Sequence, residues 1–379
     1  MTRLSRSWQG ERSLHKRLGT LLILLALPLA AALPLTAAAQ KGVTVAPDAA
    51  QRRVDITIDG NPFTSYIWPT TLKKPVLYPI VDAGGVTITR GWPLTPRPGE
   101  RTDHPHHDGL WFNYSNVNGF DFWNNSTAIP PERAAKMGTI VFNRIVSYKS
   151  GTAKGELVTD STWIDGNNHP ILAETTQYVF AHNGTSRSID LIVTLKALDH
   201  VVFHDDKDGL LGLRVARWLE SPEEKGGTFT DSNGVATPVA AAANLPGVAP
   251  PTGEYLTSEG IKGEAVWSTR ARWCALTGHN DSGHTVTIAI FDHPGNVGYP
   301  TYWHARGYGL FAANPLGRHM FDPKQPPLEF SLEQGQSVTF RYRVVIYTDA
   351  PSTKVLNQQF DSFVSSYNSG TPDRGNPAH

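Results

Sequence analysis

Apolar and polar residues alternate with a period of two along most of the chain. In 53–58 the order is Arg-Val-Asp-Ile-Thr-Ile, and similar alternation returns in 187–198, 286–291 and 337–347. Because successive side chains of a strand point to opposite faces, this period predicts half-buried β-strands. Patterns with a helical period are few. The sequence therefore predicts an all-β protein, a sandwich or a barrel, with one large antiparallel domain over 40–350.

Two segments depart from this pattern. Residues 221–262 are rich in Gly, Pro and Ala and have no clear period, which predicts a long loop inserted in the β domain. In 351–367, apolar residues recur at helical spacing, so a short C-terminal helix is predicted there. The polar remainder, 368–379, contains several Gly and Pro residues and is predicted to be disordered.

The N-terminal segment has the composition of an export signal. Basic residues precede an apolar run over 18–35, and the alanines at 37–39 fit a small-residue cleavage pattern. A membrane anchor is the alternative, but Pro28 and Pro34 interrupt a run that would need ~20 good apolar residues to span a bilayer. We expect 1–39 to be removed, and the mature chain to be periplasmic or extracellular and not bound to a membrane.

Composition narrows the expected partners. The chain has 34 Lys plus Arg and 34 Asp plus Glu. Residues 1–39 hold five basic residues and one acidic residue, so their removal leaves a formal charge of about −4. A weakly acidic surface lacks the basic face that nucleic acid requires, so no nucleic-acid partner is expected. The single cysteine, Cys274, cannot form an internal disulfide and is expected to be a small buried hydrophobe.

The densest group of chemically active side chains is the run Asp-His-Pro-His-His-Asp at 103–108. On an extended chain His104, His106 and Asp108 would share one face and His107 the other. The proline in the run argues for an edge or a loop. A histidine of near-neutral pKa beside a carboxylate can move protons at a sugar hydroxyl or anomeric centre. The run therefore predicts acid–base chemistry or substrate binding.

Two alternatives stay open for this run. His104 and His106 form a His-x-His pair similar to the start of a cupin-type metal motif, although Leu, Trp and Phe at 110–112 stand where that motif has its Glu. A divalent metal would then need a further ligand from elsewhere in the chain. The second alternative is a surface turn with solvated histidines. No other cofactor is expected, because the sequence has no glycine-rich phosphate loop.

A second group of candidates lies about 200 positions downstream. In 291–309, aromatic residues are interleaved with His, Arg and Asp, and Tyr302, Trp303, His304 and Arg306 follow one another closely. Flat apolar rings beside polar groups suit a sugar, which presents C–H patches and a rim of hydroxyls. The alternative is an aromatic core hairpin with polar groups at its surface.

The stretch 204–214 adds charged candidates. Arg214 lies in an otherwise apolar strand, so its charge needs a partner, either Asp208 or the substrate. The acids at 205, 206 and 208 could bind calcium but lack the full spacing of a calcium loop, and a solvated turn is the simpler interpretation for the first two. Glu174, at the start of a predicted strand, is either the carboxylate partner of a histidine or an exposed residue.

Several of these motifs together resemble a known family. They are Thr-Arg-Gly-Trp-Pro at 89–93, Asp-His-Pro-His-His-Asp-Gly-Leu-Trp-Phe at 103–112, Asp-Gly-Leu-Leu-Gly-Leu-Arg at 208–214, and the Asp-His-Pro and Pro-Thr-Tyr-Trp-His pieces of 292–304. Over roughly 53–347 the chain resembles secreted bacterial β proteins labelled methane oxygenase PmoA-like. Methane oxidation would need several membrane-spanning helices, which this sequence does not have. By analogy, such proteins resemble galactose-mutarotase-like supersandwiches, the fold of many sugar epimerases, lyases and hydrolases.

Taken together, these features predict a large antiparallel β-sandwich that is an exported, carbohydrate-active enzyme. Its substrate would be a small saccharide or glycoside, transformed by hydrolysis, elimination or isomerisation. The expected catalytic residues are His104, His107, Glu174 and Asp208. The expected substrate-binding residues are His106, Asp108, Arg214, Asp292, His293, Tyr302, Trp303, His304, Arg306 and Asn314.

Two other functions stay open, namely a saccharide-binding protein without catalysis and a divalent-metal enzyme built on His104 and His106. All three depend on one expectation, that the histidine run and the aromatic segment about 200 residues later fold into a common cleft. We also expect replacement of His107 by alanine to abolish turnover and, for a surface site, to change stability by no more than ~1 kcal/mol.

Overall fold

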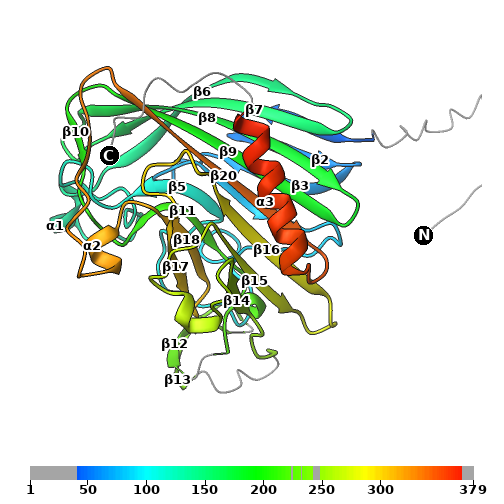
Figure 1. Ribbon diagram of the computed structural model, residues 1–379. Coiled ribbons are helices and arrows are strands. Elements are labelled where there is room, and N and C mark those ends of the chain that lie inside the picture. The colour runs from blue at the N-terminus through cyan, green and yellow to red at the C-terminus, as the bar shows by residue number, and fades with distance from the viewer. Residues whose placement is uncertain (1–40, 223–224, 232, 242–247, 369–379) are drawn as a thin grey trace, which may run out of the picture. The chain divides into compact units, whose positions relative to one another are not determined.

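The structure is a computed structural model, shown in Figure 1. The predicted signal segment 1–39 and the tail from 369 on lie outside the residues that it describes. Among the described residues, no helix combines the length and apolar character needed to cross a membrane. The described ranges are 41–222, 225–231, 233–241 and 248–368.

Two antiparallel sheets of eight strands each carry the fold of the described residues. The first sheet has the strand order β1 (Val43–Asp48), β2 (Arg53–Ile58), β3 (Asn61–Ile67), β4 (Val76–Ile80), β5 (Leu110–Tyr114), β11 (Gly209–Arg214), β18 (Leu310–Asn314) and β17 (Tyr302–Arg306). The second has the order β14 (Glu254–Thr257), β15 (Trp273–His279), β16 (Thr285–Asp292), β20 (Ser337–Tyr347), β9 (Ser186–Ala197), β8 (Pro170–Asn183), β7 (Lys154–Ile164) and β6 (Thr139–Lys149).

Short elements connect these strands. Two small antiparallel pairs join β10 (Val201–Phe203) to β19 (Phe330–Leu332) and β12 (Lys225–Thr230) to β13 (Ala236–Ala241). The helices of the described ranges are α1 (Pro131–Ala134), α2 (Arg318–Phe321) and α3 (Thr353–Asn368), and 3₁₀ turns lie at Arg217–Leu219 and Gly263–Val266.

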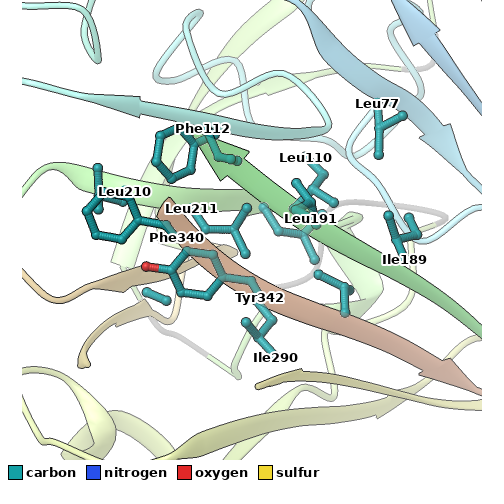
Figure 2. Packing of buried hydrophobic residues seen from close by; sticks show 14 of the residues in the cluster. Leu77, Leu110, Phe112, Ile189, Leu191, Leu210, Leu211, Ile290, Phe340 and Tyr342 are labelled. Atoms are coloured by element: carbon teal, nitrogen blue, oxygen red, sulfur yellow. The ribbon is translucent and has the colours of Figure 1, made fainter. Parts of the chain in front are cut away.

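The main core lies between the two sheets. Figure 2 shows Leu110, Phe112 and Leu211 of the first sheet together with Leu191 and Phe340 of the second. In β9 and β20 every second residue is buried, as the alternation in the sequence predicted. The predicted large antiparallel β-sandwich is therefore confirmed.

The segment 221–262, expected to be a long loop, contains strands β12, β13 and β14. The strand pattern was hidden because β12 has the sequence Lys-Gly-Gly-Thr-Phe-Thr, in which only Phe229 is a large apolar residue. Phe229 is buried, with the guanidinium carbons of Arg101 and Arg217 at 4.7 and 5.1 Å from its ring centre. A single aromatic ring thus anchors a hairpin that has little other apolar surface.

The predicted C-terminal helix is confirmed as α3, which lies across the second sheet in Figure 1. Its buried residues Leu356, Phe360 and Phe363 form an apolar cluster with residues of β15, β16 and β20, including Phe291. At its end, the Tyr367 hydroxyl donates a hydrogen bond of 2.7 Å to the Asp190 carboxylate. Helix α3 therefore covers the face of the second sheet that points away from the core.

This packing predicts a large stability loss for Phe363→Ala. The Phe363 side chain is fully buried, so its truncation should lower the free energy of unfolding by about 3–5 kcal/mol. Urea unfolding followed by tryptophan fluorescence measures the change. The matched control is Val355→Ala on the same helix, because Val355 is 37% exposed and its truncation should change stability by no more than about 0.5 kcal/mol. Equal effects of the two variants would contradict the packing of α3.

Candidate functional site

The histidine run 103–108 folds as a tight turn rather than the extended chain considered above; we call it the histidine turn. The backbone N–H of His107 donates to the carbonyl of His104 at 3.0 Å. Pro105 follows His104, and its fixed φ favours the first central position of a β-turn. The turn brings His104, His106 and His107 to the same pocket, so the expected division between two faces was wrong.

Two buried arginines hold the histidine turn. Arg90 donates to the carbonyls of His104 and His107 at 2.9 and 3.1 Å and to the Asp103 carboxylate at 2.8 Å. Arg214 donates to the same carboxylate oxygen at 2.6 Å. Burial alone would raise the pKa of Asp103, but a hydrogen bond from His104 and the two guanidiniums lower it below its usual value. Asp103 is therefore the partner that Arg214 needed, in place of Asp208.

Aromatic rings connect the histidine turn to the loop between β17 and β18. The ring of His104 lies parallel to that of His107 at 4.8 Å and to that of Tyr308 at 5.0 Å. On its other side, the His107 ring stacks on Trp111 at 5.2 Å. The four rings form a continuous stack, so the two sequence segments expected to share a cleft do meet.

One row of paired residues across the first sheet connects Trp111 with His304. Trp111 pairs with Gly212, Gly212 with Ala312, and Ala312 with His304. A side chain at Gly212 would overlap the Trp111 indole, because an added Cβ would fall inside contact distance of that ring. Gly212 thus makes room for the Trp111 indole, on which the His107 ring stacks.

The resulting pocket has a volume of about 340 Å³, within the range of small-molecule sites. Six residues predicted from the sequence line it, namely His104, His106, His107, Asp208, His304 and Arg306. Residues that the prediction did not select also line it, among them Trp123, Asn124, Lys207, Trp267 and Tyr308.

The hydrogen-bond partners of two histidines define their tautomers. Arg214 can only donate, and its Nη1 lies 3.1 Å from Nδ1 of His107, so that nitrogen accepts and Nε2 carries the hydrogen. Nδ1 of His304 lies 3.1 Å from the carbonyl oxygen of Lys207, so it donates and leaves a lone pair on Nε2. The pocket thus holds one imidazole with a free N–H and one with a free acceptor nitrogen.

Burial keeps these imidazoles neutral. It lowers the pKa of His304 to about 4, although the nearby Asp208 carboxylate raises it. Burial, together with the neighbouring imidazoles and guanidiniums, also lowers the pKa of His107 well below its usual value. His107 is only 2% exposed, so the expectation of a surface site at this residue was wrong. Its truncation would also remove the partner of Arg214 Nη1.

Trp303 does not face the pocket. Along β17, His304 and Arg306 point to the outer face, whereas Trp303 points into the core between the sheets, where its Nε1 donates to the Ala271 carbonyl at 3.1 Å. Tyr302 shares the outer face but is buried against Phe321, with ring centres 5.4 Å apart. The expected roles of both residues as sugar-stacking platforms find no support in this geometry.

Three polar candidates stabilise turns instead. The buried Asp292 carboxylate accepts from Asn296 and from the backbone of Thr301, at 2.7 and 2.8 Å. The ring of His293 packs edge-on against Phe363 of α3. Asn314 donates from its side chain to the carbonyl of residue 206 at 2.8 Å. None of these three lines the pocket with the histidine turn.

Two acidic candidates also lie elsewhere. Glu174 is buried in the second sheet, where it accepts from Trp163 Nε1 at 2.7 Å and from the Thr176 hydroxyl at 2.8 Å. It does not line the pocket, and the expectation that it partners a histidine is not met. Asp108 lines a separate hollow of about 430 Å³ with Trp92. Asp208 is thus the carboxylate among the pocket-lining residues.

The geometry of the described residues gives no support to the metal hypothesis. No three His, Cys, Asp or Glu side chains within the described ranges are arranged to hold a metal ion. His104 and His106 are close, with ring centres 5.7 Å apart, but their rings are nearly perpendicular. A third protein ligand of the kind that a structural or catalytic site requires is missing from this group.

Comparisons with known proteins give a family and a set of similar folds. A model described as "Family of unknown function (DUF6807)" matches residues 53–361. The PmoA-like family that the motifs resembled is not supported. No curated protein matches the chain.

The solved structures that are similar include sugar-active proteins. Galactose 1-epimerase from Lactobacillus acidophilus NCFM is 11% identical, with a TM-score of 0.35 and coverage of 82% of this chain and 100% of that one. A galactose mutarotase-like protein from Clostridium acetobutylicum is also 11% identical, with a TM-score of 0.35 and coverage of 81% and 98%. The galactosidase domain of an alpha-galactosidase-sucrose kinase is 10% identical, with a TM-score of 0.38 and coverage of 83% and 43%. TM-scores this low do not support a conclusion about function.

The pKa of His304 predicts a pH dependence of stability. The pKa of His304 is about 4 in the folded state, whereas the pKa of a histidine in an unfolded chain is near 6.5. Each unit of difference between the two pKa values corresponds to about 1.4 kcal/mol. The unfolded state therefore binds an extra proton between these values, and the free energy of unfolding falls as pH drops from about 6.5 to 4.

His304→Gln should remove this contribution. Urea unfolding between pH 6.5 and 4.5 should then show a shallower pH dependence than in the wild type. His200→Gln is the control, because that ring is 55% exposed, and it should keep the wild-type slope. A wild-type slope in His304→Gln as well would contradict the burial of a neutral imidazole.

Proposed function

The chain belongs to DUF6807, a family of unknown function, and we propose that this member binds a small saccharide or glycoside in the pocket beside the histidine turn and transforms it by acid–base chemistry. The observation that carries the proposal is the pairing of His107 with His304. They come from positions about 200 residues apart and line one pocket, and their Nε2 atoms have opposite hydrogen-bonding character.

The lining suits a polyhydroxylated ligand. A sugar hydroxyl both donates and accepts, so it can accept from Nε2–H of His107 and donate to Nε2 of His304. The half-buried indole of Trp267 adds apolar surface for the C–H groups of a sugar ring. Buried partners orient both imidazoles, so little order has to be created when the ligand binds.

The two imidazoles have different chemical roles. His304 Nε2 has the lone pair and acts as the base, and the Asp208 carboxylate, 3.6 Å from its Nδ1, stabilises the imidazolium that forms. A neutral imidazole N–H is a poor proton donor, so His107 stabilises negative charge that develops on an oxygen of the substrate by hydrogen bonding. The proton on His304 then returns to another atom of the same substrate.

This arrangement favours isomerisation or elimination over hydrolysis. The usual glycosidase needs two carboxyl groups that flank the scissile bond. Among the residues that line this pocket, Asp208 is the only acid, and Asp103 nearby is held by two arginines. A single imidazole that takes and returns a proton is sufficient for isomerisation.

A saccharide-binding protein without turnover is the second candidate. The observation in its favour is the rigidity of the site, because His107 is stacked between His104 and Trp111 and hydrogen-bonded to Arg214. Fixed donors and acceptors of this kind recognise a sugar without any transfer of protons. In either case we propose an exported protein, in line with the signal segment expected at 1–39.

A panel of monosaccharides, glycosides and their keto and unsaturated derivatives tests the proposal. Each is incubated with the protein in D₂O and followed by ¹H NMR and mass spectrometry, which detect isomers, elimination products and exchanged hydrogens. With a substrate found, His304→Gln should lower kcat by at least about 100-fold, the usual contribution of a general base. His107→Gln should lower it as well, and the exposed His200→Gln should retain wild-type activity.

The outcomes separate the two candidates. Binding of a panel member by the wild type without any product or exchange would favour the binding protein. Full turnover in His304→Gln would exclude His304 as the base. A panel in which no sugar binds or reacts would exclude both candidates.

A further inference from the structure

We propose that the ligand of this pocket is an acidic sugar, and that Arg306 binds its carboxylate. The inference deepens the proposed saccharide function and rests on it. It starts from the charges around the pocket and from the hydrogen-bond donors that have no partner.

Arg306 lines the pocket and has no carboxylate partner among the described residues. The Lys207 ammonium lies 2.6 Å from the Asp208 carboxylate, and Arg214 lies 2.6 Å from that of Asp103. Among the described residues, no carboxylate lies within 4.0 Å of the Arg306 guanidinium. A half-buried guanidinium in a pocket of otherwise paired charges is suited to an anionic ligand.

Aromatic rings fix the position of this guanidinium. Its central carbon lies 5.4 Å from the centre of the Trp267 ring and 6.0 Å from that of Tyr308. These contacts stabilise the cation without using its N–H groups, so the planar edge stays able to bind a carboxylate in a bidentate manner. Tyr308 also stacks on His104, so it joins Arg306 to the ring stack at the histidine turn.

Two buried donors on residues that line the pocket also lack a hydrogen-bond partner. Nε1–H of Trp267 is buried and has no partner among the described residues, and the same holds for Nε2–H of His107. Together with Arg306, these groups require acceptors from a ligand. A carboxylate has two oxygens and about four lone-pair sites. The Asp208 carboxylate also lines the pocket and carries a negative charge. Its repulsion disfavours a dianion such as a phosphate ester.

Strand geometry places the carboxylate relative to the base. His304 and Arg306 are two residues apart on the same face of β17, so their Cα atoms are separated by about 7 Å. A sugar ring that binds Arg306 through its carboxylate can therefore place another ring atom at His304. Uronates, in which the carboxylate is attached to the ring, are the substrate class that this spacing fits.

Calorimetric titration at low salt tests the inference. Galacturonate and glucuronate are compared with galactose, glucose and galactose 1-phosphate, and with acetate as a carboxylate that lacks a sugar. We expect the uronates to bind at least tenfold more tightly than the neutral sugars. Arg306→Gln should remove this preference, so that uronates and neutral sugars bind to the variant with affinities within about twofold of each other. Arg144→Gln, on the exposed edge strand β6, is the control and should bind like the wild type.

A measurement on the wild type keeps the test valid if Arg306→Gln does not fold. Raising the ionic strength from 50 to 500 mM should weaken the binding of uronates and leave that of neutral sugars unchanged. Neutral sugars that bind as tightly as uronates would overturn the inference and leave the saccharide function standing. Tighter binding of galactose 1-phosphate would overturn the choice of a carboxylate. Acetate that binds as tightly as the uronates, or a complete lack of sugar binding, would overturn both.

Discussion

The site depends on one carboxylate between two guanidiniums. Arg90 and Arg214 are almost fully buried, and the Asp103 side chain contacts both. A buried positive charge without a partner is costly, so neither arginine is tolerable there without an acceptor of this kind. Because Arg90 also binds backbone carbonyls of the histidine turn, the ion pair fixes the backbone and the rings together. The contribution of this network is therefore the geometry of the site as much as the stability of the sheet.

The polar partners of the imidazoles also determine which ring nitrogen of each carries the hydrogen. Arg214 occupies Nδ1 of His107 and so decides which of its nitrogens carries the hydrogen. The carbonyl of Lys207 does the opposite for His304. The donor and the acceptor in the pocket are thus set by partners that lie behind them, and a substitution at Arg214 would alter the chemistry of a residue that it does not itself replace.

The sequence predicted the strands better than the faces they present. A period of two shows that β17 alternates, but the outer face of the first sheet also carries an apolar cluster, with Trp111 and Leu310. With apolar residues on both faces, the pattern does not tell which one meets the core. Trp303 was therefore assigned to the site together with His304, although of the two only His304 lines it. The hairpin of β12 and β13 was missed because glycine and alanine conceal the alternation.

Side-chain contacts between residues far apart in the sequence could not be predicted, for a different reason. The residue types in 103–108 marked the histidines as reactive, and their place in the pocket could be anticipated. Nothing local indicated that Arg214 would meet Asp103, more than a hundred residues away. Arg90 appeared only within the Thr-Arg-Gly-Trp-Pro motif, without a role. Trp123 and Trp267 gave no signal, since a tryptophan in a β protein is most often part of the core.

The close packing at Gly212 has a consequence for how such a site can diversify. An added Cβ there would fall inside contact distance of the Trp111 indole, and Ala312 beside it is fully buried in the same apolar cluster. Neither residue lines the pocket, so a larger side chain at either position would displace the indole on which His107 stacks and would not fill the cavity. Ligand size can therefore change at residues that line the pocket, such as Leu310 and Trp267, whereas the row behind the imidazoles has to stay small.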